Sequence, residues 1–545
     1  MRRLLMPILA LLLCRAALGI GMAARTPAWE AYDEPFHFAY AAQIARQGTL
    51  PDSSNPMHIH PPAYYALIAA FMWLSGSAQT PLAPPDHNKY FYEGNGGINF
   101  ALPARTPEQH STERDLIAAR LFTALFALIA VAVVWRVARL AGLSAPLSLI
   151  GTAVFAYHPQ ALFSSSTLNN DAASLMLGAL FVGCLVGAAQ RRSDSFAVAA
   201  FALSGLGSFF KLNVLPLALA ACLTATLCLS WRRAIAFVVM GIAALGLIAL
   251  TLRDSDILLP FAVEVGGQAA LPALWQRLTG ELGGVLLGEA LRYGALSAFG
   301  SFGWGTVRLP VWLIGALGLG ALVGGMGAAR LWRTRLFWAL LGVCGSLVIS
   351  ALALSLLYYN PQLFNSRYLL PSLAAWALLV ALGGQASGRV GRWAGASVAC
   401  GLFGLSAWLS LDGLAAIYAP PIQFVNFSTG GVALTPEISL RAYEVLSPSV
   451  QGGESLEVAL TWAAESAIES NYTLRLAFIG ADGAIYGWLY TFHGAGRYPT
   501  AVWRPKTAFR EVYRLPLRRD VPAPSIGYVQ VLLVEAESAV LLADA

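Results

Sequence analysis

The chain has 545 residues, of which 57% are hydrophobic and only 12% are charged, and its mean hydropathy is +0.62. Soluble globular proteins carry about 25% charged residues, so these values exclude a water-soluble protein for most of the length. They also exclude a disordered scaffold, because disordered chains have few apolar residues. The 35 Lys and Arg against 29 Asp and Glu give a net charge of +6. This composition predicts a polytopic membrane protein.

A helix that spans a bilayer needs about 20 mostly apolar residues. Eleven such runs occur in the sequence. They lie at 4–22, 115–135, 144–163, 171–189, 196–211, 213–230, 234–252, 309–329, 336–357, 368–384 and 393–412. The first begins with Arg2-Arg3, as a signal peptide does, but it lacks a convincing small-residue cleavage site. We therefore expect about eleven transmembrane helices, the first of them a retained membrane anchor.

Arginines in the short loops indicate the orientation of these spans. With a cytoplasmic N-terminus, five short loops lie inside, and all are arginine-rich. Their arginines are Arg136 and Arg139, Arg191 and Arg192, Arg232 and Arg233, Arg330, Arg333 and Arg335, and Arg389 and Arg392. Since positively charged loops stay in the cytoplasm, we expect a plasma-membrane protein with an inside N-terminus. Three larger pieces then lie outside: 23–113, 253–308 and everything after 413.

From about Pro420 the apolar runs give way to alternating apolar and polar residues. Strand-like segments occur at Leu456–Trp462, Tyr472–Phe478, Ile485–Phe492, Phe509–Leu515 and Tyr528–Val534. Short alternating strands separated by turn residues are typical of a β-sandwich. The expected fold class is a polytopic α-helical membrane domain over 1–415, followed by an exterior C-terminal β-sandwich domain over 420–545.

Chemistry-bearing residues first appear in the string Tyr32-Asp33-Glu34-Pro35-Phe36-His37, directly after the first span. Adjacent carboxylates suit a general base or a pair of divalent-ion ligands. They equally suit a solvated helix N-terminus, where the helix dipole favours acids. Further on, His58 and His60 form an H-x-H pair that suits either a metal or loop packing. The apolar stretch after it, through Leu74, is too short for a confident span, so we expect a helix in the membrane interface.

Three more charged residues fall at the outer ends of expected spans. Asp171 enters the fourth span and also suits a helix cap. Lys211 ends the fifth span, where a lysine can simply snorkel to the interface. Arg367 begins the tenth span and opposes the helix dipole, so something should compensate it. Acids and bases gathered on one face suit a bound phosphate beside a nucleophile to be deprotonated, and they also suit plain ion pairs.

Several strings in this order and spacing resemble the GT-C glycosyltransferase superfamily, which includes lipid-carrier-dependent protein mannosyltransferases and the aminoarabinose transferases of lipid A. The resemblance covers roughly 20–375. It is carried by Tyr32-Asp33-Glu34-Pro35-Phe36-His37-Phe38, His60-Pro61-Pro62-Ala63-Tyr64-Tyr65, His158-Pro159-Gln160, Asn169-Asn170-Asp171 and Arg367-Tyr368-Leu369-Leu370-Pro371. In the last domain, Gly496-Arg497-Tyr498-Pro499-Thr500 and Trp503 resemble β domains appended to some bacterial membrane transferases.

This resemblance implies inverting transfer of a sugar from a polyprenyl-phosphate carrier to a glycan, lipid or protein acceptor. The transfer is expected at the outer face of the plasma membrane. The resemblance assigns Asp33 and Glu34 of this acidic motif as catalytic residues, with Asp33 as the base that takes the acceptor's proton. It assigns Lys211 and Arg367 to the donor phosphate, whose charge grows as the glycosyl bond breaks. Asp171, His37 and His60 are expected to hold a metal or to support the base.

The cofactor expected from the resemblance is at most a divalent ion, Mg or Mn. The lipid phosphate is itself the leaving group, so no nucleotide is needed, which fits the absence of a P-loop or G-x-G-x-x-G motif. Membrane lipid is an expected partner and nucleic acid is not. Two other readings stay open. A transporter or lipid flippase would favour internal repeats and mid-membrane polar residues, and a non-catalytic glycan-binding scaffold would not require this set of charges.

Overall fold

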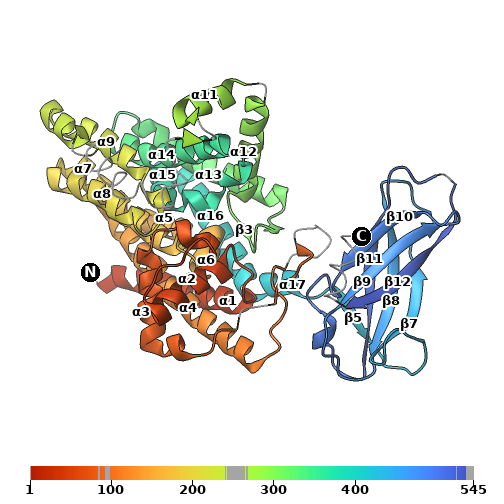
Figure 1. The fold of residues 1–545 in the computed structure, drawn as a ribbon. Helices are drawn as coiled ribbons and strands as arrows, with labels where there is room; N and C mark the ends of the chain where they lie inside the picture. The colour runs from red at the N-terminus through yellow and green to blue at the C-terminus, as the bar shows by residue number, and fades with distance from the viewer. Residues whose placement is uncertain are drawn as a thin grey trace. The chain divides into compact units, whose positions relative to one another are not determined.

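A computed structural model of the chain describes residues 2–83, 86–91, 99–239, 241, 264–265, 268–280, 282–447, 449–522 and 524–535. The chain divides into two compact units (Figure 1). The first contains Met1–Thr80 and Glu113–Leu414, and the second contains Pro81–Thr112 and Ala415–Ala545. The sequence placed 81–112 in an outer loop of the membrane domain, whereas in the structure this segment belongs with the C-terminal strands.

Helices make up the first unit. In chain order they are α1 (Arg2–Arg25), α2 (Glu34–Gln47), η1 (Pro56–Ile59), α3 (Ala63–Ser75), η2 (Ser77–Gln79), α4 (Pro107–Leu140), α5 (Ala145–Ala156), α6 (Pro159–Ser165), α7 (Asp171–Arg191), α8 (Asp194–Ser208), η4 (Leu212–Val214), α9 (Leu217–Cys228), α11 (Ala270–Thr279), α12 (Gly283–Ser297), α13 (Val311–Met326), η6 (Gly327–Leu331), α14 (Arg335–Leu357), η7 (Pro361–Leu363), η8 (Ser366–Ser372), α15 (Leu373–Ala386), α16 (Gly388–Trp408), the π-helical turn η9 (Leu409–Gly413) and α17 (Leu414–Tyr418). Two short hairpins, β1 (Glu264–Val265) with β2 (Gln268–Ala269) and β3 (Ser301–Phe302) with β4 (Val307–Arg308), interrupt them.

Seven helical segments among the described residues are long and apolar enough to cross a membrane, so the chain is a multi-pass membrane protein. They are Met6–Arg25, Pro107–Leu140, Asp171–Arg191, Val311–Leu331, Arg335–Leu357, Pro361–Ala386 and Gly388–Tyr418. Seven of the eleven expected runs coincide with these segments. Run 144–163 is broken between α5 and α6, where Pro159 cannot continue the α5 hydrogen-bond ladder. Runs 196–211 and 213–230 form the shorter helices α8 and α9, and 234–252 lies largely outside the described residues.

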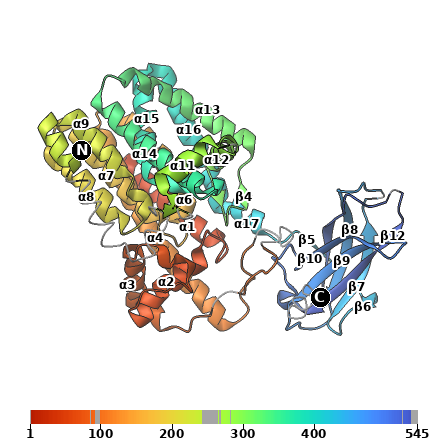
Figure 2. The ribbon, with the colours of Figure 1, turned by 45° about the horizontal axis from the view of Figure 1, so that its top comes forward.

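Helix α15 occupies the centre of the first unit, because it contacts α5, α7, α13, α14 and α16. In Figures 1 and 2, α7, α8 and α9 lie side by side at one edge. Helix α7 and turn η8 approach each other very closely at Gly178, where an added Cβ would clash with the backbone of Pro371. A glycine is required there, and this close packing fixes the start of α15 against α7.

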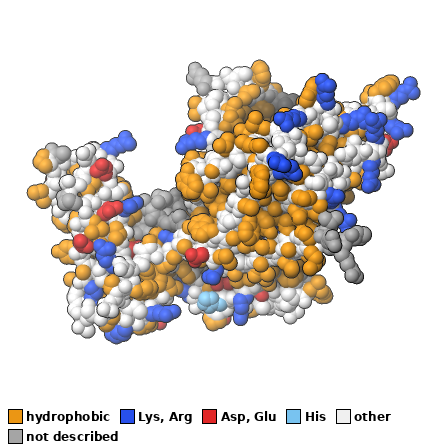
Figure 3. Space-filling model, turned by 180° about the vertical axis from the view of Figure 1, so that it is seen from behind, with side chains coloured by type: hydrophobic (Ala, Val, Ile, Leu, Met, Phe, Trp, Pro, Cys, Tyr) orange, Lys and Arg blue, Asp and Glu red, His pale blue; other side chains and the backbone are white. Residues whose placement is uncertain are grey.

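The surface of the first unit is strongly apolar. Large hydrophobic side chains are exposed on several of the candidate spans, among them Leu13 at 71%, Leu319 at 63% and Ile349 at 66%. Figure 3 shows a broad continuous field of hydrophobic side chains over this unit. Soluble monomers do not expose apolar surface on this scale, so we assign the surface to contact with lipid.

The second unit is built from two antiparallel sheets. Its strands are β5 (Ile422–Val425), β6 (Val432–Ala433), β7 (Ile438–Val445), β8 (Ser455–Ala464), β9 (Tyr472–Gly480), β10 (Ile485–Thr491), β11 (Thr507–Pro516) and β12 (Gly527–Glu535). One sheet has the order β5-β11-β8-β7-β6 and the other β10-β9-β12. All five strands expected from alternation are confirmed, and β5, β6 and β7 are additional.

A single hydrophobic core joins the two sheets into a sandwich. Trp462 of β8, Leu476 of β9 and Phe509 of β11 are at most 1% exposed within it. Trp503, from the string that resembles appended β domains, packs here and donates its ring N–H to the carbonyl of Tyr498 at 2.9 Å. Its role in this sandwich is structural.

The membrane orientation is testable with single cysteines. If Gly388–Tyr418 crosses the membrane, a cysteine at Ser387 and one at the exposed Thr429 should lie on opposite sides, because one span separates them. In a background lacking the six native thiols, an impermeant maleimide added to intact cells should label Thr429→Cys and leave Ser387→Cys unlabelled. Labelling of both in intact cells would contradict the orientation.

Candidate functional site

Glu34 and Arg120 form a buried ion pair beneath the loop between α1 and α2. Arg120 Nε lies 2.8 Å from Glu34 Oε1, and Nη2 lies 2.6 Å from Oε2, so the contact is bidentate. The other three guanidinium N–H groups donate to the carbonyl oxygens of Ala23, Thr26 and Pro27. Glu34 also accepts the backbone N–H groups of Trp29 and Leu168. Both ions are fully satisfied, which makes their burial tolerable.

This pair gives Glu34 a structural position. Its side chain is 0% exposed, and its two oxygens accept four hydrogen bonds in total. A substrate hydroxyl could not reach it without breaking the pair. The structure therefore favours a positioning role for Glu34 over the catalytic role that the sequence suggested.

A β-hairpin holds the outer side of the same loop. Tyr32 packs over Gly305 of the β3–β4 hairpin, where a side chain would clash with the phenol ring, and its hydroxyl lies 3.2 Å from Ser301 Oγ. The hairpin is itself tied to the start of α6, because Gln160 Oε1 accepts the N–H of Ser301 at 2.7 Å. The His158-Pro159-Gln160 string thus supports the loop that carries Asp33.

Asp33 stands at the N-cap of α2 in the left-handed conformation, with φ 60° and ψ 11°. This conformation is uncommon for a residue with a side chain, although Asp tolerates it better than most. The carboxylate makes no capping hydrogen bond to the helix, so it does not serve as the helix cap that an N-terminal Asp usually forms. It is 27% exposed, and its one hydrogen bond within the described residues is to Arg367.

Arg367, on η8, lies against Asp33 and two aromatic rings. Its Nη2 is 3.4 Å from Asp33 Oδ2 and 3.0 Å from the Tyr368 hydroxyl. Its Cζ lies 4.2 Å from the ring centroid of Tyr32 and 4.9 Å from that of Tyr368. The carboxylate and the π-faces compensate the charge at the start of this span. Within the described residues Nε and Nη1 have no hydrogen-bond partner, so one edge of the planar fork is free.

Asp171 and Lys211 form a second buried ion pair beside this contact. Lys211 Nζ donates to Asp171 Oδ1, and the two side chains are 7% and 2% exposed. The Lys211 ammonium also lies 5.6 Å from the centroid of the Tyr368 ring, which faces Arg367 as well. Tyr368 therefore joins the two cations, and the sequence expectation that Lys211, Asp171 and Arg367 gather in one place is met by these contacts.

Two neutral histidines border the cluster. His37 Nδ1 is 2.7 Å from the Tyr65 hydroxyl, and the His37 and His60 rings are 5.8 Å apart between centroids. Burial lowers the pKa of His37 well below its usual value, and the charges of Lys211 and Arg367 lower it further. Burial also lowers the pKa of His60, helped by His37 and Lys211 and opposed by Asp33. Both imidazoles are therefore neutral at pH 7.

Two asparagine side chains beside the cluster keep an unsatisfied oxygen. Asn170 donates to the His60 ring and to the Phe210 carbonyl, both at 3.3 Å, while its Oδ1 is buried without a partner. Asn213 donates to the Tyr368 carbonyl at 3.1 Å, and its Oδ1 is also unpartnered. Buried polar atoms are normally paired, so a buried water is the expected partner of these oxygens.

The donors do not build a metal site by themselves. No group of three His, Cys, Asp or Glu side chains suited to a metal ion occurs among the residues described. Asp171, the expected ligand, is occupied by the Lys211 ammonium, whose charge would repel a cation. The expected Mg or Mn ion does not fit this set of residues, and no chemical step below uses one.

Sequence reasoning missed Arg120, Tyr32 and Tyr368 as parts of the site. Arg120 had a usable signal, since it is a charged residue inside the expected span 115–135, and such residues are costly unless they are paired. The roles of the two tyrosines had no signal beyond their place in the quoted strings, because cation–π contacts depend on how distant segments pack.

Comparisons with known proteins add little to these observations. No family model and no curated protein matches the chain. Among solved structures, the arabinosyltransferase EmbB from Mycobacterium smegmatis is similar to 96% of this chain, with 11% sequence identity and a TM-score of 0.30. The match spans 62% of that chain, and a score this low supports no inference about fold or function. Helices, sheets and charges on their own define a multi-pass membrane protein with a C-terminal β-sandwich and a polar cluster at one end of α15.

The positioning role of Glu34 predicts a large loss of stability without a direct loss of chemistry. Glu34→Gln should lower the free energy of unfolding by about 3–5 kcal/mol, because it leaves Arg120 buried without a counterion. Asp194→Asn is the control, since it breaks the exposed pair with Arg233 and should cost at most about 1 kcal/mol. Melting of the two variants in detergent provides the comparison, and equal melting temperatures would refute the structural role of Glu34.

Proposed function

We propose that this chain is an inverting glycosyltransferase, which moves a sugar from a polyprenyl-phosphate carrier to an acceptor hydroxyl at the outer face of the membrane. The observation that carries the proposal is the state of Asp33. Its backbone is held in a sparsely populated conformation, its carboxylate is released from capping, and it faces a cation with a free binding edge. Strained residues of this kind concentrate at functional sites.

The number of accessible carboxylates favours inversion. Asp33 is 27% exposed, whereas Asp171 is 2% exposed and Glu34 is 0% exposed, each inside an ion pair. Transfer with retention by double displacement needs one carboxylate as nucleophile and a second group as acid and base. One free carboxylate suits a single displacement, in which a base activates the acceptor and the acceptor attacks the anomeric carbon directly.

In the proposed reaction, Arg367 turns its free edge to the donor phosphate and loosens its 3.4 Å contact with Asp33. Asp33 then takes the proton from the acceptor hydroxyl as the acceptor oxygen bonds to the anomeric carbon. The bond between that carbon and the phosphate oxygen breaks, and polyprenyl phosphate leaves with the additional negative charge. Arg367 and Lys211 stabilise this charge where it develops.

The other polar groups have supporting roles in this scheme. Asp171 holds the Lys211 ammonium in place by accepting one of its three N–H groups, which leaves two for the phosphate. Neutral His37 and His60 keep additional positive charge away from a site that already holds two cations.

The role of Asp33 is tested by a conservative substitution. Asp33→Asn should lower turnover of polyprenyl-phosphate-linked pentoses and hexoses by about 10²–10⁴-fold, since a general base contributes that much. Asp171→Asn should also abolish transfer, because it frees Lys211 from its position. Asp52→Asn is the control, which removes an exposed carboxylate in the segment between α2 and η1. Release of polyprenyl phosphate per folded molecule is the measurement, and normal turnover of both Asp33→Asn and Asp171→Asn would refute the assignment.

If Lys211 and Arg367 hold the donor phosphate, their substitution should lower the turnover, and a lysine should not replace the arginine. Charge-assisted hydrogen bonds are worth about 1.5–3 kcal/mol each, so Lys211→Ala and Arg367→Ala should each cut turnover about tenfold or more. Arg367→Lys should recover little, because it keeps the charge but loses the planar fork. Arg292→Ala, which removes an exposed arginine paired with Glu289, should turn over normally. Donor kinetics normalised to folded protein distinguish phosphate binding from a purely structural role of the two ion pairs. A structural role predicts lower stability with unchanged rates.

A further inference from the structure

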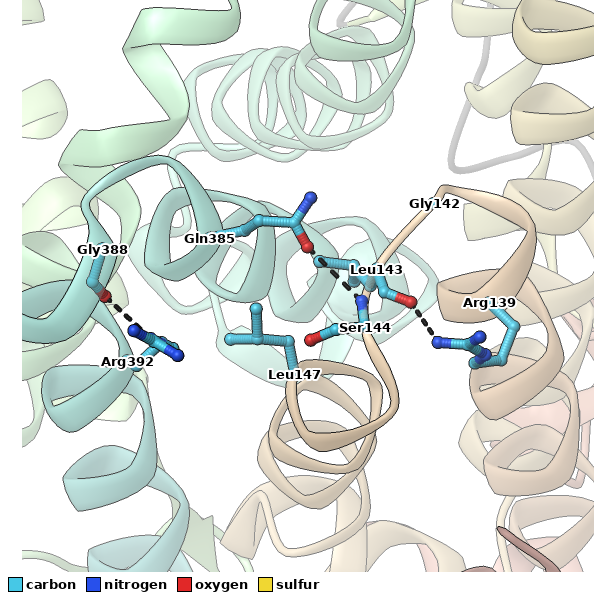
Figure 4. A pocket seen from close by; sticks show the side chains of 8 residues that line it. All are labelled: Arg139, Gly142, Leu143, Ser144, Leu147, Gln385, Gly388 and Arg392. Carbon is cyan, nitrogen blue, oxygen red and sulfur yellow. Dashed lines mark hydrogen bonds between the residues drawn. The ribbon is translucent and has the colours of Figure 1, made fainter.

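A second polar site lies at the other end of α15 from Arg367. It is a cavity of about 520 Å³ where α4 and α15 end and α5 and α16 begin (Figure 4). Its lining includes Arg139, Ser144, Leu147, Gln385, Gly388 and Arg392. Since α15 has 14 residues and rises about 1.5 Å per residue, roughly 20 Å separates this cavity from the candidate active site. It is therefore a separate site.

Both arginines of the cavity lack a counterion. Arg139 Nη1 donates to the Leu143 carbonyl, and Arg392 Nε donates to the Gly388 carbonyl at 3.2 Å. Neither forms an ion pair with a carboxylate within the part of the chain that the structure describes. In Figure 4 they stand on opposite sides of the cavity, with Ser144 and Leu147 between them. The backbone contacts fix each side chain and leave its other N–H groups available.

Two helices begin and two helices end at this cavity. Helices α5 and α16 both begin here, after Ser144 and Ser387, and neither serine makes a side-chain capping bond. Helix N-termini carry partial positive charge and unpaired N–H groups. Arg392, near the start of α16, opposes that helix's dipole and would be stabilised by an anion, whereas Arg139 lies in the last turn of α4, where the dipole favours a cation.

The surroundings of the cavity are those of a membrane interface. Leu147 is buried at its floor, while Val390 and Trp393 on the first turns of α16 are 71% and 74% exposed. Exposed tryptophan beside arginine is typical of the headgroup layer. A phosphodiester linked to acyl chains would satisfy the guanidinium groups and cover the exposed apolar side chains, whereas free phosphate would satisfy only the former.

We propose that this cavity binds the phosphate of an anionic phospholipid headgroup, in the leaflet opposite the candidate active site. Basic cavities between transmembrane helices on the cytoplasmic side bind such headgroups, and the arginine-rich loops predict that side here. The proposal does not depend on the transferase activity, because it uses none of the residues of the candidate active site.

A titration of the full-length protein in neutral detergent tests the proposal. Short-chain phosphatidylglycerol, short-chain phosphatidylcholine and inorganic phosphate are added separately, and the melting temperature is followed. Phosphatidylglycerol should stabilise the protein at concentrations about tenfold lower than either of the others. Arg139→Gln/Arg392→Gln should weaken that response at least about tenfold, as expected for the loss of charge-assisted hydrogen bonds.

Matched variants decide the outcome. Arg333→Gln/Arg335→Gln removes the same charge from another predicted inside loop and should keep the response within about twofold. Arg139→Lys/Arg392→Lys keeps the charge without the fork and should respond in between, which also covers the case in which the glutamine variant fails to fold. Equal responses of the two glutamine variants would overturn the proposal. Stabilisation by inorganic phosphate as strong as that by phosphatidylglycerol would also overturn it, in favour of a soluble ligand.

Discussion

The bidentate ion pair between Glu34 and Arg120 is the interaction on which the candidate site depends. It joins the end of α1, the start of α2, the middle of α4 and the loop before α7 through seven hydrogen bonds. In a low-dielectric interior such a pair is tolerated only when every donor and acceptor is satisfied. Because all five N–H groups of Arg120 are used, the geometry has little freedom. The loop that carries Asp33, the proposed base, is consequently held firmly in place.

Adjacent residues of one motif therefore perform opposite tasks. Glu34 is buried in its ion pair with Arg120. The left-handed backbone of Asp33, in contrast, turns its carboxylate toward Arg367. The strain of that conformation, of order 1–3 kcal/mol, is offset by the satisfied pair underneath. A general base has to be accessible and held in place at once, and this division of labour between neighbours meets both needs.

The charged side chains at the two ends of α15 have different kinds of partner. At one end, acids, cations and aromatic rings compensate one another around Tyr368. At the other end, Arg139 and Arg392 line a cavity and form no ion pair among the described residues, and the proposed partner there is an anionic headgroup. The proposed catalysis needs both acidic and basic side chains in contact with one substrate. Binding of an anionic lipid needs only basic side chains.

The sequence by itself determined the membrane class, the C-terminal sandwich and the segments that form the polar cluster, because apolar runs, alternation and local motifs are properties of neighbouring residues. Three of the expected runs form broken or shorter helices, since such helices have the same composition as a continuous one. The resemblance singled out Asp33 as the base, but nothing in the sequence shows that its neighbour Glu34 is buried in an ion pair. Only the tertiary structure decided between them, because their partners, Arg367 and Arg120, lie 334 and 86 residues away, and burial beside a distant residue sets which carboxylate remains free.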